Sequence, residues 1–157
     1  MTAPVLQLSR LTKRFPARGG RMVHAVSDVS LSVQAGEVVG LVGESGSGKS
    51  TIGMMAARLI EPTAGTVLFE GRDITRLPEP ALRPLRARLQ IVFQDPWSAL
   101  NPRMTIRRAL EEPFLVHGRS SGAARRAAAD ALADRVHLPR ASLDRYPHEL
   151  SGGQLQR

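Results

Sequence analysis

One glycine-rich segment constrains the fold of this chain more than any other feature. The segment Gly43-Glu-Ser-Gly-Ser-Gly-Lys-Ser50 lies between a short, continuous apolar stretch, residues 37–42, and a stretch with helical patterning, residues 50–60. The apolar stretch predicts a strand covered on both faces. The following stretch predicts a helix that ends near Pro62. A strand that runs through a glycine-rich loop into a helix indicates an α/β domain.

The same segment predicts a phosphate-binding site. It fits the pattern G-x-x-x-x-G-K-[ST], whose backbone N–H groups converge on one point at the positive end of a helix. Lys49 would reach the β- and γ-phosphates of a nucleotide, and the Ser50 hydroxyl would bind Mg²⁺. The candidate nucleotide contacts here are Gly43, Glu44, Ser45, Gly46, Ser47, Gly48, Lys49, Ser50 and Thr51. The alternative is a glycine-rich turn with a chance lysine, which would not require a strand before it and a helix after it.

Two later segments narrow the choice among phosphate-loop proteins. Leu150-Ser-Gly-Gly-Gln154 resembles the signature motif of the ATP-binding cassette family, and residues 91–106 resemble that family's Q-loop in the form typical of oligopeptide, dipeptide and nickel importers. The resemblance implies that Gln94 positions water or Mg²⁺ in catalysis, together with Lys49. It also implies that Ser151, Gly152, Gly153 and Gln154 contact a nucleotide held by a second subunit. Ser151 and the paired glycines also predict an anion site at the start of a helix. The other interpretations are a small-residue helix cap for the signature segment and an ordinary surface residue for Gln94.

An aromatic residue near the N-terminus completes the predicted ATP site. Phe15, in Leu11-Thr-Lys-Arg-Phe15, resembles the family position whose ring stacks on adenine. A flat apolar ring suits this role because it stacks without selecting a particular base. The alternative is an ordinary core phenylalanine. For Trp97, within the Q-loop segment, an interface anchor and a packed subdomain residue are equally plausible.

The resemblance, which covers essentially the whole chain, implies the fold class. We expect an α/β, RecA-like P-loop NTPase core with an N-terminal antiparallel β subdomain and an α-helical subdomain. Residues 1–95 would form the β subdomain and phosphate-loop core, and residues 96–157 the helical subdomain. Strand patterning appears at residues 5–11, 26–33, 65–71 and 89–93, a helical pattern at 81–88, and Thr105 and Ser121 are predicted to cap two later helices.

The resemblance also implies what the 157 residues do not contain. Family members continue past the signature into a strand with an Mg²⁺-ordering aspartate, then a catalytic glutamate and a histidine. We therefore expect a fragment in which the C-terminal part of the core is missing. Such a chain would be hydrolytically incompetent alone, and the loss of central strands would weaken cooperative folding.

The implied function is ATP binding and hydrolysis coupled to transmembrane transport, with peptides or nickel as the imported substrate. The expected partners are permease subunits and a second ATPase subunit, identical or different, on the cytoplasmic face of the cell membrane. The alternatives are a soluble cassette ATPase acting in translation or on DNA, and an inactive nucleotide-binding remnant. The net charge of +8 is compatible with nucleic acid, but the arginines are scattered among alanines without stacking aromatics, so no nucleic-acid partner is expected. The absence of cysteine excludes disulfides and thiolate metal sites.

Overall fold

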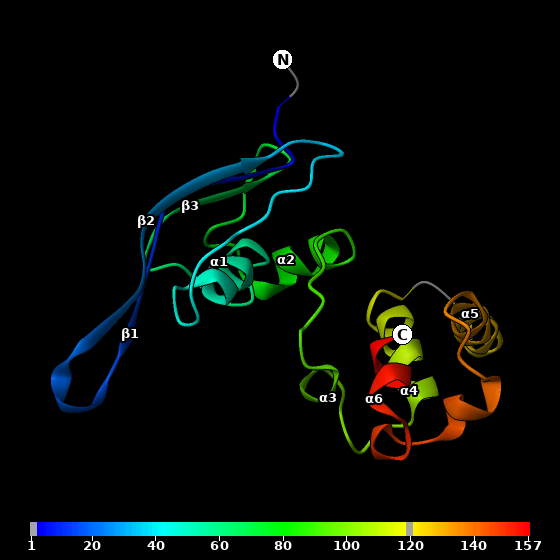
Figure 1. Ribbon diagram of the computed structural model, residues 1–157. Helices are drawn as coiled ribbons and strands as arrows, with labels where there is room; N and C mark the ends of the chain where they lie inside the picture. The colour runs from blue at the N-terminus through cyan, green and yellow to red at the C-terminus, as the bar shows by residue number, and fades with distance from the viewer. Residues whose placement is uncertain (1–2, 119–120) are drawn as a thin grey trace. The chain divides into compact units, whose positions relative to one another are not determined.

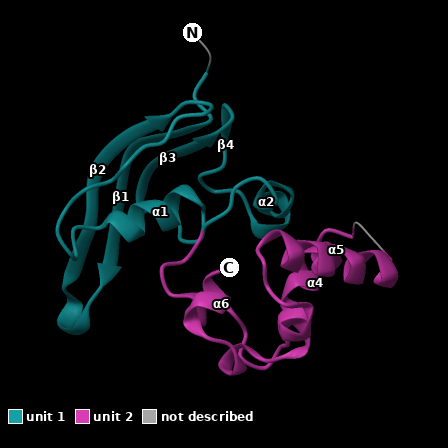
Figure 2. Cartoon of the chain, turned by 45° about the vertical axis from the view of Figure 1, so that its right-hand side comes forward, with its two compact units in different colours: residues 1–91 teal, residues 92–157 magenta. Residues whose placement is uncertain are grey.

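The computed structural model describes residues 3–118 and 121–157, which form two compact units, one up to Ile91 and one from Val92 (Figure 2). The first unit contains β1 (Leu6–Pro16), η1 (Arg18–Gly20), β2 (Met22–Val33), α1 (Lys49–Ala56), β3 (Ala64–Phe69), β4 (Arg72–Asp73) and α2 (Glu79–Arg86). The second contains α3 (Pro96–Ala99), α4 (Ile106–Val116), α5 (Gly122–Arg135), η2 (Arg140–Asp144), η3 (Pro147–Glu149) and α6 (Gly152–Gln156).

The first unit is built on an antiparallel sheet with the strand order β2-β1-β3-β4. In the register of this sheet, Leu6 of β1 lies opposite Val33 of β2 and Phe69 of β3. Pairing between β1 and β3 stops at Thr12, whereas β1 and β2 continue together to a hairpin tip at η1 (Figure 1). The predicted strands at 5–11, 26–33 and 65–71 are confirmed, and the first two are longer than the sequence pattern indicated.

Helix α1 covers one face of this sheet and contributes two residues to the buried core. Ile52 and Met55, three residues apart on α1, are buried against a set of strand residues: Leu8, Leu11, Val26, Val67 and Phe69. This spacing places both helix residues on the same side of α1. Burying each large apolar side chain contributes about 1.5–3 kcal/mol. The sheet and the core packing therefore hold α1, and with it the glycine-rich loop at its N-terminus.

Two predicted strands are wrong. Residues 37–42 and 89–93 contain no strand, and the side chains of Val38, Val42 and Val92 are 96%, 99% and 96% exposed. The apolar pattern is typical of a strand with neighbours on both sides and layers on both faces. Among the described residues no strand pairs with either segment, so their backbones stay irregular. The first helix is also shorter than predicted, because it ends at Ala56 rather than at residue 60.

The second unit is helical, and side-chain caps begin its main helices as predicted. Thr105 Oγ1 accepts a hydrogen bond from Arg108 N at 3.4 Å before α4, and Ser121 Oγ accepts one from Ala124 N at 3.4 Å before α5. The buried core of this unit comprises Ile106, Ala133, Leu138, Leu143 and Leu150. None of the helices in the described ranges has both the length and the apolar composition needed to cross a membrane.

Candidate phosphate-binding site

The glycine-rich loop packs directly against strand β2. Gly46 and Gly48 have φ values of 82° and 91°, in the left-handed region that favours glycine. A Cβ atom added to Gly48 would lie 2.3 Å from the Ala25 carbonyl oxygen and 3.3 Å from Val26 Cγ2. Only glycine allows this approach, so the end of the loop is fixed by contact with the sheet.

Lys49 begins α1 and folds back over the loop. Its Nζ donates hydrogen bonds to the carbonyl oxygens of Gly43 at 2.8 Å and Glu44 at 2.6 Å, and to Ser47 Oγ at 3.3 Å. The ammonium group is therefore held by the loop that the sequence pattern assigns to phosphate. The first-turn N–H groups of an α-helix lack intrahelical partners, and Ser50 and Thr51 lie in this turn of α1. The arrangement gathers an ammonium group, hydroxyls and backbone N–H groups, which are the donors that a polyphosphate requires.

Phe15 lies on the same pair of strands that supports the loop. Its side chain is 37% exposed, so it is not part of the buried core. Phe15 is paired with Val23 of β2, two residues before Ala25, whose carbonyl group contacts Gly48. The exposed ring and the phosphate loop are therefore connected through one short stretch of β2. Sequence analysis alone did not identify this stretch of β2 as their common support.

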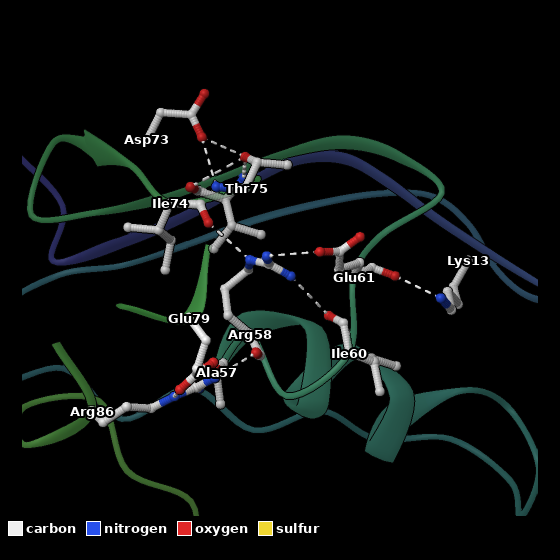
Figure 3. Close-up of polar contacts among 11 residues, drawn as sticks. Lys13, Ala57, Arg58, Ile60, Glu61, Asp73, Ile74, Thr75, Glu79 and Arg86 are labelled. Carbon is white, nitrogen blue, oxygen red and sulfur yellow. Dashed lines mark hydrogen bonds and ion pairs between the residues drawn. The ribbon is translucent and has the colours of Figure 1, made fainter. Parts of the chain in front are cut away.

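The far end of α1 is held by two arginines that sequence analysis did not single out (Figure 3). Arg58 is only 4% exposed, and its Nε donates to the Ile74 carbonyl oxygen at 2.8 Å. Arg86 donates to the carbonyl oxygens of Ala57 at 2.6 Å and Arg58 at 3.0 Å. Cations that bond the last carbonyl groups of a helix satisfy them and complement the negative end of its dipole. The only signal in the sequence was a charged residue within the apolar run that closes the helix.

Beside this network, Thr75 fills a backbone position in the sheet. Its Oγ1 accepts a hydrogen bond from Val67 N at 2.8 Å and donates to Asp73 Oδ1 at 2.5 Å (Figure 3). These bonds from the Thr75 hydroxyl and backbone N–H lower the pKa of the Asp73 carboxyl group. The Thr75 hydroxyl oxygen thus gives Val67 N of β3 the hydrogen-bond acceptor that a neighbouring strand would otherwise supply.

Gln94 lies in the second unit and is exposed, immediately before the short helix α3. The adjacent Asp95 is the N-cap of this helix, since its Oδ1 accepts a hydrogen bond from Trp97 N at 3.0 Å. Trp97 itself is 47% exposed. The segment therefore presents a neutral amide and an indole ring at its surface, while the carboxylate is used for capping.

The predicted helix start at Ser151 is confirmed. Ser151 Oγ accepts from Gln154 N at 3.3 Å, and Gln154 Oε1 accepts from Ser151 N at 3.0 Å, forming a reciprocal capping box at α6. Cβ atoms added at Gly152 and Gly153 would meet no neighbour within 4 Å. Helix α3 contacts α6, so this unit brings the Gln94 segment next to the signature segment. The role of Ser151–Gln154 in nucleotide binding stays a prediction, because the capping box alone accounts for the conformation seen here.

Comparison with known proteins places this geometry in a family. The sequence profile described as ABC transporter matches residues 26–157. The chain belongs to the ABC transporter family. The described residues of this ABC transporter chain contain no group of three or more His, Cys, Asp or Glu side chains arranged to hold a metal ion.

Two curated relatives are named as a transport protein and an import protein. The chain is 46% identical over 160 residues to the oligopeptide transport ATP-binding protein AppF of Bacillus subtilis (strain 168), covering 98% of this chain and 49% of AppF. It is 44% identical over 160 residues to the glutathione import ATP-binding protein GsiA of Salmonella typhimurium, covering 98% of this chain and 26% of GsiA. The chain thus spans about half the length of AppF and about a quarter of GsiA.

A solved structure has the same fold. The ATP-binding cassette MJ0796, described as a dimer in a post-hydrolysis state bound to ADP and Pi, has a TM-score of 0.83 and 32% identity. The match covers 96% of this chain and 65% of that one. The predicted fold class, an α/β P-loop NTPase of the cassette type, is confirmed by this likeness.

Proposed function

We propose that this chain is the nucleotide-binding part of an ATP-driven importer for peptides. The observation that carries the proposal is the phosphate loop, with Gly48 seated on β2 and the Lys49 ammonium held across the loop at 2.6–3.3 Å. The printed names of AppF and GsiA, an oligopeptide transport protein and a glutathione import protein, support peptides as the substrate class. Nickel import, which the Q-loop resemblance also allows, has no counterpart in these names.

Each candidate residue has a role in this proposal. Lys49 would move from the loop carbonyl groups to the β- and γ-phosphates, and Phe15 would stack on adenine. Ser50 and Gln94 supply oxygen ligands suited to Mg²⁺, which would neutralise phosphate charge when bound. The remaining candidate contacts are backbone groups and hydroxyls in two segments: Gly43–Ser47 with Thr51 in the first unit, and Ser151–Gln154 in the second.

The proposed assembly contains a second ATPase subunit and membrane permease subunits, with this chain on the cytoplasmic face of the membrane. The dimeric description of the cassette MJ0796 supports pairing of two such chains. The exposed indole of Trp97, next to Gln94, supports a protein interface at the Q-loop segment. In this arrangement the signature of one chain would face the nucleotide of the other.

We further propose that the 157-residue polypeptide binds ATP without turning it over. General-base catalysis needs a group that accepts a proton near the attacking water. The Gln94 amide cannot act in this way, and the neighbouring Asp95 carboxylate is occupied as the cap of α3. We therefore expect this chain to bind ATP without hydrolysing it.

The test is isothermal titration of the full chain with ATP and Mg²⁺, comparing Lys49→Ala with the surface control Arg135→Ala. A hydrogen bond to a charged group contributes about 1.5–3 kcal/mol, so Lys49→Ala should weaken binding about 10- to 150-fold. Arg135→Ala removes the same charge from an exposed position of α5 in the second unit and should leave affinity unchanged. Equal affinity of Lys49→Ala and the unaltered chain would refute the proposed phosphate site.

A pull-down with the full chain tests the transport role. Recovery of ribosomes or DNA, rather than permease subunits, would refute that role.

A further inference from the structure

We infer that Lys13 is a positioning residue of the nucleotide site, which fixes the ring of Phe15 and ties it to the end of α1. This inference rests on the proposed function, because it assigns a task to a residue that would touch neither the phosphates nor the catalytic water. It adds a residue outside the phosphate loop, the Q-loop and the signature segment.

Lys13 has two partners that hold it in one place. Its Nζ lies 5.0 Å from the centroid of the Phe15 ring, within the range of a cation–π contact. The same Nζ donates a hydrogen bond to the Glu61 carbonyl oxygen at 2.6 Å. Lys13 and Phe15 are two residues apart on β1, which places their side chains on the same side of the strand. The ammonium group therefore bridges the aromatic ring and the segment that follows α1.

Glu61 is itself attached to the phosphate-loop helix. Its carboxylate lies 3.5 Å from the guanidinium of Arg58, whose side chain is 2% exposed. Arg58 in turn bonds the Ile74 carbonyl oxygen, and its own carbonyl oxygen accepts from Arg86 (Figure 3). Figure 3 shows Lys13 approaching Glu61 from one side and Arg58 from the other. A continuous set of contacts thus joins the Lys13 ammonium to the C-terminal end of α1, the helix that begins with Lys49.

This arrangement makes the two faces of the Phe15 ring unequal. The ammonium group occupies one face, so a base can stack only on the opposite face. Fixing the ring beforehand also removes part of the side-chain entropy that nucleotide binding would otherwise cost. Because Lys13 ties the Phe15 ring to the end of α1, the distance between the ring and the phosphate loop stays constant. A nucleotide that contacts both the ring and the loop requires such a constant distance. The contribution is expected only when the ligand carries a base.

The test is a double-mutant cycle in the full chain, with titration of ATP and of inorganic tripolyphosphate. An exposed cation–π contact implies that Lys13→Met weakens ATP binding about two- to five-fold while tripolyphosphate binding stays unchanged. Lys13→Arg keeps the cation and should restore ATP affinity. In a Phe15→Leu background, Lys13→Met should have no further effect, because the ring it positions is gone. Arg14→Met, which removes the same charge from the next residue of β1, is the matched control and should leave both affinities unchanged.

Each other outcome has a definite meaning. Equal loss of ATP and tripolyphosphate affinity in Lys13→Met would show that the charge acts on the phosphates, and would overturn the positioning role. A loss that persists in Phe15→Leu would overturn it as well, since Lys13 would then act through Glu61 alone. If the unaltered chain binds ATP and Lys13→Met binds it equally well, the inference fails while the proposed function survives. If the unaltered chain binds neither ligand, the proposed function itself fails, and the inference with it.

Discussion

Replacing Gly48 with alanine is the sharpest test of how the phosphate loop is built. A residue other than glycine at a φ of 91° costs about 1–2 kcal/mol. The new Cβ would also lie 2.3 Å from the Ala25 carbonyl oxygen, well inside the 3.0 Å that real Cβ contacts respect, so loop or strand must shift by roughly 0.7 Å. Overpacking of this kind costs about 1–3 kcal/mol. We expect Gly48→Ala to lower the free energy of unfolding by about 2–5 kcal/mol.

Two neighbouring glycines separate the backbone cost from the steric cost. Gly46 has a φ of 82°, but an added Cβ would meet nothing within 4 Å, so Gly46→Ala should cost only the conformational part, about 1–2 kcal/mol. Gly53 lies inside α1, also with open space around it, and Gly53→Ala should stabilise the chain by about 0.5–1 kcal/mol. The three variants therefore predict the order Gly53→Ala, Gly46→Ala, Gly48→Ala from most to least stable.

Urea unfolding followed by circular dichroism measures the three free energies, and titration at a temperature where each variant is folded measures ATP affinity. Gly48→Ala should weaken ATP binding most, since the displaced loop no longer aims its N–H groups at one point. A Gly48→Ala variant no less stable than Gly46→Ala would refute the reasoning, because the contact with Ala25 would then carry no cost.

Three further predictions follow from contacts in the two units. Thr75→Val keeps the shape but leaves the Val67 N–H without its side-chain acceptor, so the free energy of unfolding should fall by about 1–3 kcal/mol in urea titration. Arg58→Met removes the buried guanidinium that bonds the carbonyl group after β4, and hydrogen exchange should show faster opening of the last turn of α1. Arg140 lowers the pKa of the Asp134 carboxyl group from its usual value of 3.8, so this pair stabilises the fold above that value, and the contribution is lost as pH falls through the lower folded value. Asp134→Asn should remove that part of the acid sensitivity in unfolding experiments below pH 4.

The sequence predicted best those features that depend on neighbouring residues. The caps at Thr105 and Ser121 and the helix start at Ser151 follow from hydrogen bonds within one turn, and all three are confirmed. The sequence pattern predicted the glycine-rich loop at Gly48. It did not predict the contact with Ala25, because that contact depends on how the loop packs against the sheet. These predictions succeeded because each depends on interactions between residues close together in the sequence.

The failures concern interactions between residues far apart in the chain. The apolar stretches at 37–42 and 89–93 have the composition of buried strands, but strands form only where a partner offers hydrogen bonds. Arg58 was missed because two of its partners, Ile74 and Arg86, lie 16 and 28 residues away in the sequence. The role of Lys13 could not be predicted, because its bond to Glu61 spans 48 residues.

The nearly complete exposure of Val38 and Val42 has a practical consequence for anyone handling this polypeptide. A backbone segment with unpaired N–H and C=O groups and exposed apolar side chains readily pairs with a strand of another molecule. This association increases with protein concentration. Purified samples should therefore be most uniform when dilute, and light scattering should rise on concentrating them. A charged substitution at Val42, such as Val42→Lys, should delay that rise without touching the packed face beneath the sheet.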